Sequence, residues 1–202
     1  MQREFLYGIK FAFASDINCN LYKSALQYLK EHADLLKTNS IKELYENCYR
    51  EVESEDLSLI FLANDIDFLK YTNEIPKFSF QNLDLMSFEI PAHITSIGEG
   101  AFMDTTLRTI IIPGNVVEIG HNAFLNCSYL KEVVMEEGVK TINDFAFYAI
   151  KPGAEIYFPR SIEHIDNYAI PVETLEKINI FVYAGTYAED FFNDEGIIYN
   201  IR

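Results

Sequence analysis

The sequence predicts an α/β solenoid with a ladder of parallel strands, preceded by a small, mainly helical N-terminal domain. The tract IPAHITSIGEGAF begins at residue 90, and its pattern returns three more times along the chain. The N-terminal third lacks this pattern and instead has apolar residues at helical spacing. Internal repeats of roughly 20–50 residues indicate stacked coils, in which each coil buries its apolar face against its neighbours.

The repeats have a regular period. Taking Pro91 as the reference, successive steps of 22, 23, 23 and 24 residues lead to Pro113, Glu136, Pro159 and Tyr183. This period lies in the range of leucine-rich repeats. The drift of one residue between coils is of the size that loops absorb.

Each coil repeats the same kinds of residue after its reference position. Two apolar columns are predicted to point inward: Ile94, Val116, Val139 and Ile162, then Ile97, Ile119, Ile142 and Ile165. The residue directly after each member of the second column is of a type that tolerates positive φ. This predicts a left-handed bend in each coil, at Gly98, Gly120, Asn143 and Asp166. A small residue before a bulky one then predicts one short helical turn at Ala101–Phe102, Ala123–Phe124, Ala146–Phe147 and Ala169–Ile170.

A strand is predicted before each reference residue, with side chains alternating between the two faces. The inward set is Phe88 and Ile90, Ile110 and Ile112, Val133 and Met135, Ile156 and Phe158, Ile180 and Val182. The outward row is Glu89, Ile111, Val134, Tyr157 and Phe181. A second outward row is Ser87, Thr109, Glu132, Glu155 and Asn179.

Aligned aromatic and aliphatic side chains on adjacent strands are typical of protein interfaces, in which aromatic anchors dominate. We therefore predict a binding face made of Ile111, Val134, Tyr157, Phe181, Thr109, Glu132 and Glu155. Two alternatives stay open for the apolar residues. The chain's own N-terminal domain covers them, or a second copy does.

The N-terminal region is predicted to form a capping domain over residues 1–77. Alternating apolar residues at 5–13 suggest a strand, with a short apolar helix as the alternative. Three helices are predicted to follow, from Asp16 or Asn18 to about Leu36, from Ser40 to about Val52, and from about Ser54 to Tyr71. Such a block would cover the first coil of the solenoid.

The solenoid, with a C-terminal cap, is predicted to span residues 78–202. Phe80 precedes Pro91 by the same distance in sequence that separates Phe102 from Pro113, so the first coil is expected to begin near residue 78.

These repeats resemble the BspA-like leucine-rich repeat family, whose motif is a strand ending in Ile-Pro, then VxxIGxxAFxxC and a Leu. Cys127 and Leu130 fit this motif, and the resemblance covers about residues 80 to 192. The fourth repeat departs from the motif, with Ile170 in place of Phe and Glu173 in place of the small residue. The segment 180–191 resembles the closing strand and cap of such proteins. The resemblance implies a right-handed solenoid used for adhesion or protein recognition, in proteins that are mostly at the cell surface or secreted.

Composition limits the classes of partner. The chain is 49% hydrophobic and 14% aromatic, which is enough for a folded core. Its net charge is -15, of which residues 74–202 contribute -11. Nucleic acid and anionic membranes repel such a surface, so we expect neither as a direct partner. A basic or neutral protein partner is expected instead.

Targeting signals are not evident. The small residues around Ala12 and Ala14 suggest a cleavage site, but Lys10 interrupts the apolar run and the segment is shorter than most signal peptides. No apolar run approaches the roughly 18 residues that cross a bilayer. The sequence therefore predicts a cytoplasmic protein.

Metal-binding patterns are sparse. His93, His121 and His164 occupy different positions in their coils, so they are not expected to converge on a metal. Glu132 and Glu155 are expected to be neighbours on adjacent strands, but a calcium site needs about six or more oxygen ligands. We therefore expect no metal and no cofactor.

Catalytic patterns are sparse too. Cys19, Cys48 and Cys127 contain no CxxC pair. Cys127 is expected to be a buried thiol, and a Cys19–Cys48 disulfide is an alternative only if the first two helices pack suitably. Phosphate-binding loops, HExxH and GxSxG are absent from the sequence. We predict that the protein is not an enzyme.

Three functions stay open at this stage. The first is a recognition module that binds a partner protein through the strand face. The second is an acidic inhibitory protein, such as a phage encodes, that mimics nucleic acid and blocks a nucleic-acid-handling enzyme. The third is a scaffold that self-assembles through unprotected strands. Salt separates the first two, because it screens charge attraction more than apolar contact.

Overall fold

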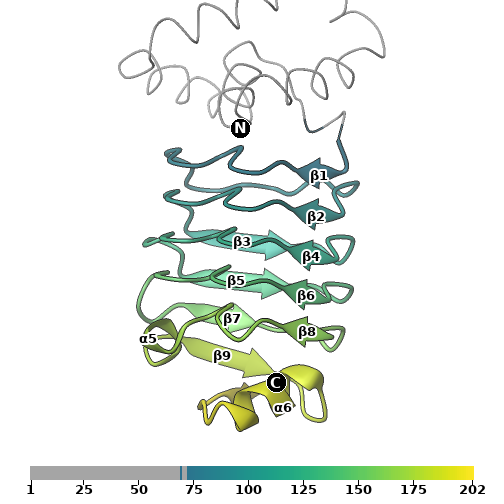
Figure 1. Ribbon diagram of the computed structural model, residues 1–202, viewed down its shortest axis with the longest axis vertical. Coiled ribbons are helices and arrows are strands. Elements are labelled where there is room, and N and C mark those ends of the chain that lie inside the picture. Colours follow the sequence, from purple (N-terminus) through teal and green to yellow (C-terminus); the bar gives the residue numbers. More distant parts are fainter. Residues whose placement is uncertain (1–68, 70–71) are drawn as a thin grey trace, which may run out of the picture. The chain divides into compact units, whose positions relative to one another are not determined.

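The computed structural model describes residue 69 and residues 72–202. The predicted N-terminal strand and helices, and also Cys19 and Cys48, lie outside these residues. The described part is a stack of coils whose strands form two parallel sheets, shown side by side in Figure 1. The predicted solenoid with parallel strand ladders is confirmed.

The two sheets differ in strand length. The narrow sheet has the order β1–β2–β4–β6–β8, with β1 Glu74–Ile75, β2 Ser96–Ile97, β4 Glu118–Ile119, β6 Thr141–Ile142 and β8 His164–Ile165. The wide sheet has the order β3–β5–β7–β9–β10, with β3 Thr109–Ile112, β5 Glu132–Met135, β7 Glu155–Tyr157, β9 Asn179–Val182 and β10 Asn200–Ile201. Two short helices, α5 Val172–Leu175 and α6 Tyr187–Asp194, lie in the C-terminal coils.

The narrow sheet is built on one column of isoleucines. Ile97 pairs in register with Ile119, and the register continues through Ile142 to Ile165. Each of these side chains is at most 2% exposed. The predicted column is therefore confirmed as continuous.

The column extends one coil further toward the N-terminus than the sequence suggests. Ile75 in β1 pairs with Ile97, so the sheet includes residues that precede the predicted start at 78. The repeat is hard to see here because Pro76 follows Ile75, whereas Gly98 follows Ile97.

A stack of phenylalanines fills the layer behind the column. The rings of Phe80, Phe102, Phe124 and Phe147 stack on one another at centroid distances of 5.2, 5.2 and 5.3 Å, and their planes are nearly parallel. All four side chains are buried. The prediction of a helical turn in this layer is wrong, because the segments around Phe102, Phe124 and Phe147 are hydrogen-bonded turns.

The predicted left-handed bend is also wrong in position. Within the described residues, positive φ occurs instead two residues later, at Gly100, Asn122 and Phe145, with φ of 59°, 56° and 58°. Gly98 and Gly120 have a different role, since a Cβ on either would lie 2.7 Å from the backbone oxygen of the preceding coil. Glycine at these two positions permits close stacking rather than an unusual dihedral angle.

The wide sheet is displaced by one strand from the prediction. Residues 88–90 form no strand and only Ser87 bridges to Thr109, so Glu89 does not belong to the outward row. At the other end, the chain returns after α6 and β10 pairs in parallel with β9. The predicted closing segment is therefore followed by one more strand.

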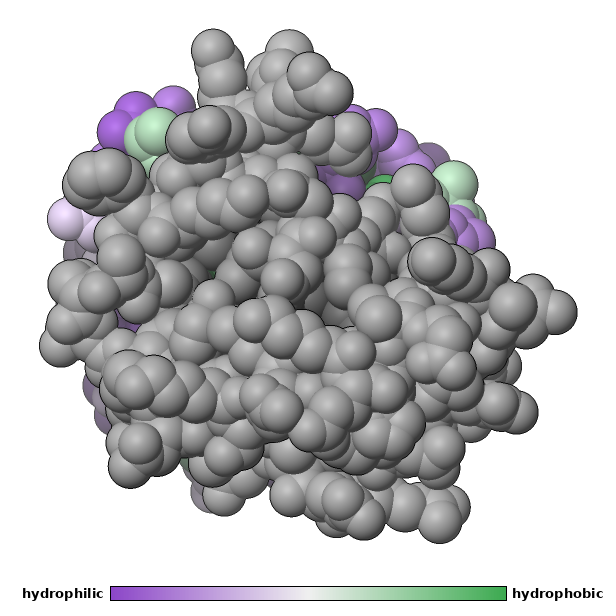
Figure 2. All heavy atoms as spheres, turned by 90° about the horizontal axis from the view of Figure 1, so that it is seen from above, coloured by the Kyte–Doolittle hydropathy of each residue, from purple (hydrophilic) through white to green (hydrophobic). Residues whose placement is uncertain are grey.

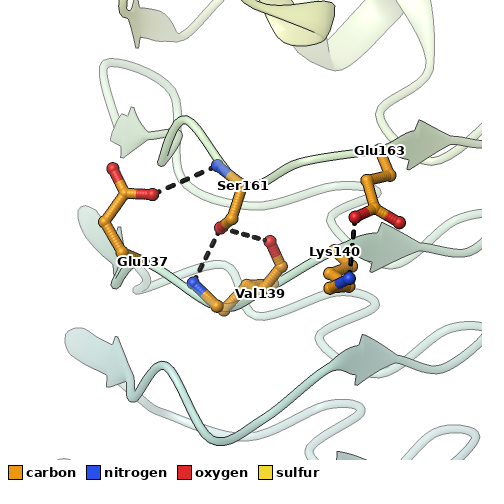
Figure 3. A network of polar contacts seen from close by, with 6 residues as sticks. Glu137, Val139, Lys140, Ser161 and Glu163 are labelled. Atoms are coloured by element: carbon orange, nitrogen blue, oxygen red, sulfur yellow. Dashed lines mark hydrogen bonds and ion pairs between the residues drawn. The ribbon is translucent and has the colours of Figure 1, made fainter.

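Polar side chains join successive coils at the corner between the sheets (Figure 3). Ser161 Oγ accepts a hydrogen bond from Gly138 N at 2.7 Å and donates to Val139 O at 2.8 Å. The Glu137 carboxylate accepts from the backbone N of Arg160 and Ser161 at 3.0 and 3.1 Å. These groups satisfy backbone atoms that the strands leave unpaired, so their role is structural.

Candidate functional site: the outer face of the wide sheet

Four outward side chains form one row across the wide sheet. Ile111 is in register with Val134, Val134 with Tyr157, and Tyr157 with Phe181. Ile111 is 58% exposed, and the other three are half-buried. We call these four residues the apolar row. The structure brings the predicted residues together, and their role in binding stays a prediction.

Polar residues lie beside the apolar row. Figure 2 views the molecule from above, and the described residues that are visible at its margin are mostly hydrophilic. On the face that carries the apolar row, Thr109, Glu132 and Glu155 are in register in the second outward row. A partner on this face therefore meets a line of apolar groups beside two carboxylates.

A hydrogen bond links the two rows. The Tyr157 hydroxyl donates to Glu155 Oε2 at 2.8 Å. This bond raises the pKa of Tyr157 above its ordinary value, because loss of the proton would place a phenolate beside a carboxylate. The ring is thereby held in one orientation, with its hydroxyl as a donor.

The C-terminal end of the face combines rings and guanidinium groups. Tyr157 stacks on Phe181 with a centroid distance of 4.5 Å and an interplanar angle of 13°. The Arg202 Cζ lies 5.2 Å from the Tyr157 centroid and 4.8 Å from that of Tyr183. Arg160 lies over Tyr183 at 4.1 Å. The sequence did not reveal this cluster, because Arg202 reaches it only through the unpredicted strand β10.

A second group of exposed aromatic residues lies elsewhere on the coils. Phe145 stacks on Tyr168 at 5.8 Å and meets Tyr148 edge-on at 6.1 Å. These rings line an open cleft of about 530 Å³, which we call the aromatic cleft. The cleft was not predicted from the sequence, although one signal was present: Phe145 and Tyr168 precede the repeated Ala, where earlier coils have Gly100 and Asn122.

The described residues contain no cluster of metal-ligating side chains. Within residue 69 and residues 72–202, no group of three or more His, Cys, Asp or Glu side chains could hold a metal ion. His164 Nε2 lies 2.7 Å from Asp166 Oδ1 in its own coil. In the same part of the chain, no helix has the length and apolar character that crossing a bilayer requires.

Cys127 is a buried thiol, as predicted. Its Sγ donates to Phe102 O at 3.1 Å and lies 3.3 Å from Thr105 Oγ1. Burial raises the pKa of Cys127 from 9.0 to about 11, because a thiolate would be poorly solvated there. The thiol is therefore a poor nucleophile at neutral pH.

The Cys127 environment predicts slow alkylation. At pH 8, iodoacetamide should modify Cys127 at least about 100-fold more slowly in the folded protein than in guanidinium chloride, because two pKa units suppress the thiolate by that factor. Peptide mapping by mass spectrometry reads this cysteine separately from the other two. Equal alkylation rates in the folded and unfolded states would show that the thiol is not buried.

The same pKa shift affects stability at high pH. Because the pKa of Cys127 is higher in the folded state, the contribution of this thiol to stability is complete below pH 9.0 and is lost as pH rises through about 11.

A family model of repeated coils agrees with this architecture. The family model of the BspA type leucine rich repeat region matches residues 73–197 in six copies. A crystal structure of a leucine-rich repeat protein from Bacteroides capillosus is similar, with 34% identity, 43% of this chain and 63% of that chain covered, and a TM-score of 0.37. The match thus spans less than two thirds of that protein. No curated protein matches the chain. The repeat model covers more than half of the sequence, and the chain belongs to the BspA-type leucine-rich repeat family.

Proposed function

We propose that this protein is a non-enzymatic recognition module that binds a segment of a partner protein on the outer face of the wide sheet. The observation that carries the proposal is the apolar row, which runs in register across β3, β5, β7 and β9 and begins with an Ile111 side chain that is 58% exposed. An isolated exposed apolar residue is ordinary, but a continuous row is typical of a contact surface. Membership of a repeat family that generally mediates protein interaction supports the same function.

The charges beside the row indicate the chemistry of the partner. Glu132 and Glu155 flank the row, Arg202 lies over the Tyr157 ring at its C-terminal end, and residues 74–202 carry a net charge of -11. A basic or neutral segment is favoured, since it brings no like charge to these carboxylates. Such a segment would place apolar side chains on the row and N–H donors or cations on the carboxylates.

A paired-variant experiment tests this face. The double variant Tyr157→Ser/Phe181→Ser should lose the partner that the wild-type chain captures from a host lysate, because it removes both stacked rings. The matched control Tyr129→Ser changes a tyrosine that is 57% exposed and lies outside the row, and it should retain the partner. The double variant should lose no more than about 1–2 kcal/mol of unfolding free energy. A loss above about 3 kcal/mol would identify the two rings as core instead.

The salt dependence of binding distinguishes capture through the strand face from capture through the acidic surface as a whole. Capture through the apolar row should change little between low and high salt, whereas a nucleic-acid mimic should lose affinity steeply. A steep loss, together with retained capture by the double variant, would favour the inhibitory protein. Sizing of the protein in solution tests self-assembly independently.

A further inference from the structure

The aromatic cleft has a composition that differs from the apolar row and shares no residue with it. Its main lining residues are Phe145, Tyr148, Tyr168, Pro171, Glu173 and Glu195. They come from two successive turns, from the short α5 and from the end of α6. The cleft thus combines three aromatic rings with two carboxylates, and Lys and Arg are not among the described residues that line it.

The ring of Phe145 distinguishes its coil from the two before it. Its φ is 58°, and the equivalent residues Phe78, Gly100 and Asn122 have φ of 56°, 59° and 56°, so this conformation is a feature of the repeat. The Phe145 side chain is 39% exposed, and its ring contacts Tyr148 and Tyr168 in the cleft.

The electrostatic environment of the cleft is negative. Glu195 is the C-cap of α6, so the C-terminal end of that helix, with its partial negative charge, faces the same region. The last turn of α6 contains no basic residue. Within residues 72–202, neither the Glu173 nor the Glu195 carboxylate has a hydrogen bond or an ion pair. Both carboxylates are therefore available to a ligand.

We infer that the aromatic cleft is a second binding site, which receives a lysine or arginine side chain of a partner protein. An alkylammonium or guanidinium group is attracted to the faces of Tyr and Phe rings and to the two carboxylates, while its aliphatic stem packs against the rings. Neutral ligands gain only the stacking, and anions are repelled. The inference goes beyond the strand face, because it assigns the basic character of the partner to a separate pocket.

Small side-chain analogues test the site on the full 202-residue chain. n-Butylammonium represents lysine and n-propylguanidinium represents arginine, with n-butanol and butyrate as the neutral and anionic analogues. In an NMR titration, the two cations should shift the ring signals of Phe145, Tyr148 and Tyr168. They should bind about tenfold more tightly than n-butanol, in line with the strength of cation–π contacts and carboxylate pairing. Equal binding of n-butanol, or binding of butyrate, would overturn the inference.

Matched variants locate the binding. Tyr168→Ser changes a ring that is 60% exposed, so the fold should persist while cation affinity falls about tenfold, and Tyr168→Phe should retain most of it. Glu173→Gln should weaken cations but not n-butanol, whereas Glu176→Gln, an exposed neighbour outside the lining, should change neither. If Glu173→Gln and Glu176→Gln have the same effect, the attraction is only the general charge of the surface and the site is refuted.

The strand face provides the final control. Tyr157→Ser/Phe181→Ser should leave cation binding in the cleft unchanged, so failure of one site does not imply failure of the other. If a neutral sugar such as N-acetylglucosamine shifts the same ring signals and the cations do not, the rings form a carbohydrate platform and the inference is wrong.

Discussion

Replacing Gly114 with alanine is expected to lower the unfolding free energy of the solenoid by about 3 kcal/mol or more, since overpacking against the main chain is among the most disruptive substitutions. A Cβ at this position would overlap the carbonyl oxygen of Glu137 in the next coil. The obstructing atom belongs to the backbone, and the hydrogen bonds of Ser161 Oγ with Gly138 N and Val139 O hold this backbone in place on the far side. Urea unfolding followed by far-UV circular dichroism measures the change.

Gly153→Ala is the matched control. Gly153 has a φ of 80° and nothing within 4 Å of an added Cβ, so its substitution costs only backbone strain, about 1–2 kcal/mol. Gly114 has no such φ, and its cost comes from contact alone. If Gly114→Ala were no more destabilising than Gly153→Ala, close approach of the coils would not be what requires glycine at this corner.

Truncating Phe124 to alanine is expected to cost about 3–5 kcal/mol, the range for a buried phenylalanine. The side chain is fully buried and stacks on Phe102 at 5.2 Å and on Phe147 at 5.3 Å. The substitution therefore weakens two coil interfaces together. Because each coil of a solenoid contacts only its neighbours, the remaining halves should unfold less cooperatively. The urea transition should broaden as well as shift to lower concentration.

Phe124→Leu separates the effect of lost side-chain volume from the effect of any substitution at this position. Leucine keeps most of the apolar contact, so about 1–1.5 kcal/mol should be lost and the transition should stay narrow. A loss below 1 kcal/mol for Phe124→Ala, with no broadening, would contradict the view that the phenylalanine stack couples the coils.

The sequence predicted the parts of the fold that depend on periodicity. Residues such as Ile97 and Ile119 recur at the coil length, and stacking coils must place them over one another, so the column and the apolar row followed directly. The structural role of a glycine was not predictable, because glycine is favoured both where φ is positive and where two backbones approach closely. Gly98 and Gly120 permit close approach, and only their distance to the backbone of the preceding coil reveals this role.

Features made by the end of the chain were beyond prediction for a different reason. Strand β10 has two residues and lacks the repeat pattern, so its pairing with β9 depends on where α6 directs the chain. The aromatic cleft has the same origin, because Glu195 meets Tyr168 only after the last coil has closed. The places of Phe145 and Tyr168 in the repeat do signal the rings of the cleft, but local sequence carries no signal for the arrival of Glu195 or for the pairing of β10.

Alternation of buried and outward side chains in the wide sheet has an evolutionary consequence. Ile110 and Ile112 hold β3 in the core, whereas Ile111 between them faces outward and 58% of it is exposed. Exchanges at outward positions therefore alter the chemistry of the surface at little cost to folding, and duplication of one coil adds fresh positions of the same kind. This architecture allows the surface to diversify without a new scaffold.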